Sequence, residues 1–241
     1  MKDAADIRRK IEQFEYGYVF TYDDFNVAPS KENVLKKNLS RLVQAGKIIR
    51  LSKGRFYKPK KGIVGNLKPD EYEIVKDLLK DGDKIIGYIT GYSIFNALKL
   101  TTQVPNVIQI GSNFDKKGIK RNIYTIKFVR QWNKITQSNI PLLQLLDCVR
   151  FIKNIPDTSI DNSVKRLLVL FSELSDSDKK QITELATNYP PSSRALTGAI
   201  LEKTGNDVLA DKLYKSLKLT STYKLNISNK ILPNTERWRI Q

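Results

Sequence analysis

A run of hydrogen-bonding and cationic side chains near the N-terminus has the spacing of one helix face. Between residues 30 and 45, Leu35, Leu39 and Leu42 recur at intervals of four and three, which predicts an amphipathic helix. The opposite face carries side chains of the kinds that hydrogen-bond to base edges and phosphates in the major groove of DNA. These candidate contacts are Ser30, Asn33, Lys36, Lys37, Ser40, Arg41 and Gln44. An ordinary amphipathic helix with a solvated face would show the same pattern, so this helix alone does not decide the function.

A second group of cations follows in a predicted β-hairpin. Residues 48–51 and 55–58 have the character of strands, and the turn between them contains Gly54. The candidate phosphate contacts here are Arg50, Lys53, Arg55 and Lys58. A cationic hairpin tip beside a cationic helix fits the backbone and the groove of a duplex together. The two groups therefore predict an interface with double-stranded DNA.

The elements that position these residues are predicted in a characteristic order. A helix ending near Phe14, a short strand at residues 19–20 and a short helix at residues 22–25 come first. The candidate helix then begins at Ser30 and is closed by Gly46, and the hairpin follows. Helix, strand, helix, helix and hairpin is the order of a winged helix-turn-helix.

The remainder of the chain predicts a second, larger domain. We expect the winged helix-turn-helix to occupy residues 1–66, with a linker over residues 60–69. Residues 67–241 predict a mixed α/β domain that is mostly helical, so the expected fold class is α+β.

The charge of the chain favours a polyanionic partner. The formal net charge is +17, from 42 basic and 25 acidic residues. Residues 31–61 hold eleven Lys/Arg against one acid, and a one-sign stretch this dense is typical of a nucleic-acid interface. Two further basic segments, 116–130 and 224–239, lie elsewhere, and whether they contact DNA is left open.

Several kinds of chemistry are not expected. Histidine is absent and Cys148 is the single cysteine, so neither a Ser-His or Cys-His nucleophile nor an internal disulfide can form. We expect Cys148 to be a buried structural thiol. No GxxxxGK[ST] or GxGxxG motif is present, and the acidic clusters fall at predicted turns and helix starts. The sequence therefore predicts a protein that is not an enzyme and has no cofactor and no metal. The charged N-terminal segment, which lacks an apolar signal core, predicts a cytoplasmic location without membrane association.

Several strings resemble the AbiEi-type antitoxins of type IV toxin-antitoxin systems, in the DUF6088-like branch common in Bacteroidetes. The resemblance covers nearly the whole length and rests on IRRKIEQFEYGYVFTYDDF, NVLKKNLSRLVQAGKIIRLSKGRFYKPK, GYITGYSIFNALKLTTQVP, LLQLLDCVRFIKNIPD, YPPSSRALTGAILEKTG and SLKLTSTYKLNISNKILPNTERWRI.

This resemblance implies a biological role and a partner that the spacing of residues does not show. It implies an N-terminal winged helix that represses its own operon by binding inverted repeats at the promoter, with possible self-association on DNA. It also implies a C-terminal antitoxin domain at residues 67–241. The functional partner would be a nucleotidyltransferase-like toxin, which is counteracted without a stable complex.

Two other classes of function remain open. One is the DNA-targeting subunit of a nucleic-acid-processing enzyme, which would need a carboxylate-carboxylate-lysine metal site in residues 70–241. The other is a ligand-responsive winged-helix transcription factor with a polar pocket near Tyr92. In the simpler interpretation of that polar stretch, Thr90 is the N-cap of a helix.

Overall fold

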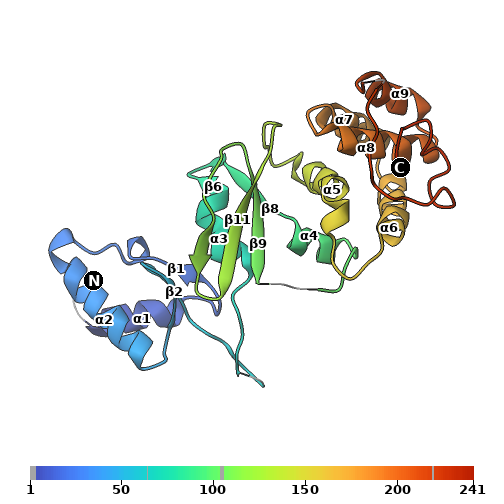
Figure 1. Cartoon of the computed structure of the whole chain (residues 1–241). Helices are drawn as coiled ribbons and strands as arrows, with labels where there is room; N and C mark the ends of the chain where they lie inside the picture. Colours follow the sequence, from blue (N-terminus) through green and yellow to red (C-terminus); the bar gives the residue numbers. More distant parts are fainter. Residues whose placement is uncertain (1–3, 64, 104–105, 219) are drawn as a thin grey trace. The chain divides into compact units, whose positions relative to one another are not determined.

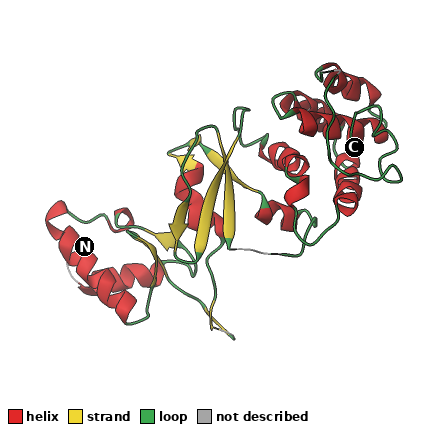
Figure 2. Ribbon diagram, in the orientation of Figure 1, coloured by secondary structure: helices red, strands yellow, loops and turns green. Residues whose placement is uncertain are grey.

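The computed structural model describes residues 4–63, 65–103, 106–218 and 220–241. Its fold class is α+β, as predicted (Figures 1 and 2). The chain divides into two compact units. Unit 1 consists of Met1–Leu78 and Gly118–Ile126, and unit 2 of Leu79–Lys117 and Lys127–Gln241.

Unit 1 begins with the order of elements that the sequence predicts. They are α1 (Ala4–Gln13), β1 (Val19–Phe20), the 3-10 turns η1 (Asp23–Phe25) and η2 (Pro29–Lys31), α2 (Glu32–Gln44), β2 (Ile49–Ser52) and β3 (Arg55–Tyr57). The three strands form an antiparallel sheet in the order β1-β3-β2. One detail differs from expectation, because Ser30 lies in the turn η2 and not on the helix α2.

The core of unit 1 lies between its first two helices and the sheet. Ile7 and Ile11 of α1 are four residues apart and therefore face the same side, where they are buried with Leu35 and Leu39 of α2. Aromatic rings from the turns and strands complete this core, and Phe20 is fully buried among them. Figure 1 shows α1 and α2 side by side.

The segment predicted as a linker is partly structured. Strands β4 (Lys61–Gly62) and β5 (Gly65–Asn66) pair antiparallel, and Leu67 N donates to the carbonyl of Lys60 at 2.8 Å. Helix α3 (Glu71–Leu79) follows, and unit 1 is completed by β10 (Ile119–Arg121) with the start of β11 (Tyr124–Arg130). The division of the chain therefore differs from the predicted boundary at 66/67, because α3 and a returning hairpin pack with the N-terminal elements.

Unit 2 contains strands followed by a long helical part. Its elements are β6 (Lys80–Asp81), β7 (Lys84–Ile85), β8 (Gly87–Thr90), α4 (Tyr92–Ala97), β9 (Val107–Ser112), α5 (Ile140–Arg150), η3 (Ile152–Asn154), α6 (Ile160–Ser172), α7 (Asp176–Ala186), α8 (Pro191–Lys203) and α9 (Asp207–Lys215). Within unit 2, β8 pairs antiparallel with β9, and Ile89 lies opposite Ile110.

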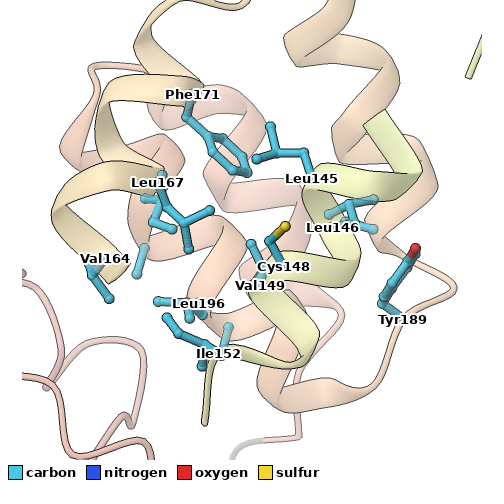
Figure 3. Packing of buried hydrophobic residues seen from close by; sticks show 14 of the residues in the cluster. Leu145, Leu146, Cys148, Val149, Ile152, Val164, Leu167, Phe171, Tyr189 and Leu196 are labelled. Atoms are coloured by element: carbon cyan, nitrogen blue, oxygen red, sulfur yellow. The ribbon is translucent and has the colours of Figure 1, made fainter. Parts of the chain in front are cut away.

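Helix α5 is the centre of the core of unit 2. Figure 3 shows Leu145 and Cys148 of α5 opposite Leu167 and Phe171 of α6, all of them buried. Burial raises the pKa of the Cys148 thiol well above its ordinary value. Cys148 is therefore the buried packing residue that the sequence predicts.

The C-terminal segment is fastened to α8 by Trp238. This side chain is 0% exposed, and its Nε1 donates to the Glu202 carboxylate at 2.7 Å. The indole lies directly over Gly198, where a Cβ atom would stand 2.1 Å from Cη2 of Trp238. Only a glycine leaves room for the ring at this position.

We expect Gly198→Ala to lower the free energy of unfolding by about 2 kcal/mol, since overpacking a well-filled core costs about 1–3 kcal/mol. Urea denaturation followed by circular dichroism measures the effect. In the double variant Gly198→Ala/Trp238→Leu the two losses should not add, because the clash partner is gone. Full stability of Gly198→Ala would show that the ring does not pack as described.

Candidate nucleic-acid interface

Helix α2 has one buried face and one exposed face. Leu35 and Leu39 are 1% and 0% exposed, and Leu42 and Val43 are half-buried beside them. All four pack in the core of unit 1, because their spacing places them on one side of the helix. The opposite side of α2 therefore faces solvent.

The candidate contacts on α2 lie on this exposed side. Asn33, Lys37, Ser40, Arg41 and Gln44 are all exposed, at helical positions separated by four, three, one and three residues. Residues at such intervals share a helix face. The structure thus brings together five of the side chains predicted from the sequence, on a rigid element and open to a ligand.

Ser30 and Lys36 have different surroundings. Ser30 is exposed but precedes α2, because Pro29 starts the turn η2 there. Lys36 Nζ lies 2.6 Å from Glu32 Oε1 and 5.6 Å from the ring centroid of Tyr22. The hydrogen bond with Glu32 raises the pKa of Lys36, so the lysine stays charged while part of its field is compensated.

The turn between β2 and β3 carries exposed cations. Ser52 pairs with Arg55 across the hairpin, so Lys53 and Gly54 form a two-residue turn. Gly54 has φ +76°, a conformation that favours glycine. Lys53 at the tip and Arg50 on β2 are both exposed.

Arg50 Nε donates to the carbonyl of Ser52 within the hairpin at 3.3 Å, and the other two cations have partners elsewhere in unit 1. Arg55 Nη2 donates to Asp77 Oδ2 at 2.6 Å. Lys58 Nζ donates to the carbonyl of Glu12 at 2.9 Å and lies 4.6 Å from the ring centroid of Tyr16. Arg55 and Lys58 thus help to hold unit 1 together, and their contact with phosphates stays a prediction.

The carboxylate of Asp77 is shared by two guanidinium groups. Arg121 of β10 donates to Oδ1 at 2.6 Å and to Oδ2 at 2.7 Å, and it also donates to the carbonyl of Ile74. The Arg121 side chain is only 4% exposed. Burial would raise the pKa of Asp77, but the hydrogen bonds and charges of Arg121 and Arg55 outweigh it and hold this pKa below its ordinary value.

The two arginines of the basic segment 224–239 also have partners within unit 2. Arg237 forms ion pairs with Glu202 and Asp211. Arg239 donates to the carbonyl of Lys218 at 2.9 Å and to the hydroxyl of Tyr214 at 3.2 Å. These two arginines fasten the C-terminal segment, whereas sequence alone left open whether their segment contacts DNA.

The polar stretch near Tyr92 forms part of a buried network in unit 2. The hydroxyls of Tyr88 and Thr90 both donate to Asp147 Oδ2 at 2.7 Å, and Tyr189 donates to Oδ1 at 3.0 Å. Gln131 Nε2 donates to both tyrosine oxygens at 2.7 Å. Burial raises the pKa of Asp147, although these hydroxyl donors pull it down.

This network corrects one expectation and adds a residue that sequence reasoning missed. Thr90 does not cap α4, whose N-cap is Gly91, and its hydroxyl is used by Asp147 instead. Asp147 lies in the apolar helix α5 and is 0% exposed. A carboxylate among leucines was the signal that could have found it, since buried charges need partners.

Two features are absent from the part of the chain that the structure describes. No three potential metal ligands gather there. Nor does any helix within those residues have the length and apolar character needed to cross a bilayer. The expectation that no metal is bound stays a prediction.

A family model described as a family of unknown function (DUF6088) matches residues 6–172. The chain belongs to this family. Its fold is similar to that in the crystal structure of the RV2827C protein from Mycobacterium tuberculosis, with a TM-score of 0.64 and 13% sequence identity over 97% of this chain and 88% of that chain. At that identity the likeness shows the fold alone. No protein with a curated function matches the chain.

We expect Asp77→Asn to lower the free energy of unfolding of this family member by about 2 kcal/mol at pH 7. Removing one partner of a buried ion pair costs about 3–5 kcal/mol, and the partial exposure of Asp77, 34%, reduces that cost. Because the folded pKa of Asp77 is depressed, its contribution is complete above the ordinary pKa and disappears as the pH falls through the folded pKa. Urea denaturation followed downward from pH 7 should therefore show a constant difference between the two proteins until the pH falls below the ordinary carboxyl pKa of 3.8, and a shrinking difference below it.

The matched control for this variant is Asp115→Asn. The Asp115 carboxylate is 89% exposed and lies 3.8 Å from Arg130, so its loss should change stability by less than about 0.5 kcal/mol. Equal effects of the two substitutions would contradict the structural role of Asp77.

Proposed function

We propose that unit 1 is a winged helix-turn-helix that binds duplex DNA. In this proposal α2 lies in the major groove and the β2–β3 turn lies on the neighbouring backbone. The observation that carries it is the exposed face of α2, which carries Asn33, Lys37, Ser40, Arg41 and Gln44, while Leu35 and Leu39 anchor the other face. The exposed cations Arg50 and Lys53 add contacts for phosphates.

The side-chain types on α2 suggest a division of roles. Asn33 and Gln44 carry amides, which pair well with adenine, and Lys37 carries a cation of the kind that contacts guanine. Arg41 and Lys53 are suited to phosphates, which position a protein without specifying sequence. The charge of +10 over residues 31–61, from eleven Lys/Arg and one acid, supports binding by release of counterions.

The biological role that we propose rests on the resemblance to AbiEi-type antitoxins. The protein would repress its own operon from inverted repeats at the promoter, with one unit 1 on each repeat. It would also counteract a nucleotidyltransferase-like toxin without forming a stable complex with it. Both tasks place it in the cytoplasm as a regulator and not as an enzyme.

Specific and non-specific contacts can be separated by substitution in the full chain. We expect Lys37→Ala and Gln44→Ala each to weaken binding to the chain's own promoter duplex by about 5- to 150-fold, as base contacts contribute about 1–3 kcal/mol. Binding to a random duplex should change little. Lys53→Ala should instead weaken both duplexes by similar factors and reduce the slope of log K against log salt by about 1. Fluorescence anisotropy with labelled duplexes gives both quantities.

Lys165→Ala, at an exposed position on α6 in unit 2, serves as the control and should leave both affinities unchanged. An unchanged ratio of promoter to random affinity in both α2 variants would contradict the role given to α2.

Substitutions on α2 should remove repression without removing toxin neutralisation. We expect the full chain with Lys37→Ala and Gln44→Ala to lose repression of a promoter fusion but still to restore growth of cells that express the nucleotidyltransferase-like toxin of this proposal. The physical reason is that both substitutions lie on an exposed helix face of unit 1 and leave unit 2 intact. Failure of the unaltered chain to restore growth would refute the antitoxin role and leave DNA binding untouched.

A further inference from the structure

Exposed aromatic and cationic side chains alternate along one extended segment of unit 2. From Arg130, at the end of β11, every second residue is exposed, namely Arg130, Trp132 and Lys134. The residues between them, Gln131 and Asn133, are 1% and 6% exposed and belong to the buried hydrogen-bond network. The buried pair therefore fixes which way the exposed residues point.

Trp132 has an unusual setting for an exposed indole. Its side chain is 44% exposed, and the guanidinium of Arg150 lies 4.5 Å from its ring centroid. Arg150 also lies 4.7 Å from the ring of Phe151 and donates to the carbonyl of Arg130 at 2.8 Å. The ring of Tyr189 packs against the indole at an interplanar angle of 69°, with the ring centroids 6.0 Å apart. A fixed cation thus covers one face of an aromatic ring that is nearly half open to solvent.

A second pairing of a cation and an aromatic ring involves Phe128 of β11. Lys116 Nζ is 5.5 Å from the ring centroid of Phe128. Asn113 donates to two carbonyls of the extended segment, at 2.8 and 2.7 Å, which holds the chain before Lys116 beside it. One acid lies nearby: the Asp115 carboxylate is 3.8 Å from Arg130. Because the Asp115 side chain is 89% exposed, it compensates little of the positive charge of Arg130.

We propose that this surface binds single-stranded nucleic acid. We call it the Trp132 surface, and it consists of Lys116, Phe128, Arg130, Trp132, Lys134 and Arg150. An unpaired base stacks on Trp132, and the phosphates on either side of it contact the cations.

The chemistry of the surface favours a single strand over other polyanions. Residues 113–117 and 127–134 hold five Lys/Arg against one acid, which attracts a phosphate backbone. A fixed ring beside cations adds a stacking platform, which every unpaired base can use because every base has a π face. The bases of a duplex are stacked on each other and cannot use it. The surface shares no residue with the proposed duplex interface of unit 1.

The natural fluorescence of the protein gives a direct test. The chain contains two tryptophans, and Trp238 is 0% exposed, so a change of emission on binding reports Trp132. We expect a mixed-sequence 12-nucleotide RNA to quench the emission of the full chain, and the quenching to be absent in Trp132→Phe. Trp132→Ala should weaken binding of the labelled RNA about tenfold.

Two controls accompany this test. Tyr72→Ala removes a similarly exposed aromatic side chain, 43%, and should leave RNA affinity unchanged. Promoter duplex binding should be unaffected by Trp132→Ala, so that a failure here is distinct from a failure of the proposed duplex interface. If Trp132→Ala does not fold, the double variant Lys116→Ala/Lys134→Ala, at two exposed positions, takes its place with the same expected loss.

Three results would overturn the proposal. They are the absence of quenching by RNA, unchanged RNA affinity in Trp132→Ala, and quenching by a random 12-base-pair duplex equal to that by the single strand. The last result would show that the surface contacts a duplex backbone instead.

Discussion

The carboxylate of Asp77 joins three segments of unit 1 that are far apart in the sequence. It accepts hydrogen bonds from Arg55 of the β2–β3 hairpin and from Arg121 of β10, while Asp77 itself lies on α3. Because Arg121 is almost fully buried, its charge requires this partner. The hairpin whose tip carries Lys53 is therefore fixed by a charge network and not by its short strands alone. Strands of three and four residues provide few hydrogen bonds, so the anchor matters for how firmly the turn is held.

A second buried carboxylate has a comparable role in unit 2. Asp147 joins the sheet, through Tyr88 and Thr90, to the corner between α7 and α8, through Tyr189. Gln131 uses both amide hydrogens on the two tyrosine oxygens, so the network is well satisfied, as buried polar groups require. Because the buried side chain of Gln131 points into the interior, the side chain of the next residue, Trp132, points outward. A surface feature of unit 2 thus depends on a polar arrangement in its interior.

Local patterns in the sequence predicted the elements of unit 1 well. The spacing of Leu35 and Leu39 identified α2 and its buried face, and the Lys53-Gly54 turn identified the hairpin, because helical periodicity and turn preferences act over a few residues. The partner of Arg55 could not be predicted, since Asp77 is 22 residues away and an ion pair leaves no periodic signal. For the same reason the local sequence predicts Thr90 as a helix cap, although its partner Asp147 lies 57 residues further along the chain. Exposure of the candidate contacts followed from the helix face, whereas the engagement of Arg55 and Lys58 depends on tertiary contacts.

Unit 1 is discontinuous, which has a consequence for the order of events during synthesis. When synthesis has reached Leu78, the nascent chain contains Asp77 but lacks Arg121. The ribosome must add Leu79–Lys117, which belong to unit 2, before the hairpin that completes unit 1 exists. At about 5–20 residues per second this delay lasts about 2–8 s. A chain released early from the ribosome therefore carries the α2 face without the contacts that complete the unit around it, and the two units mature in an interleaved order.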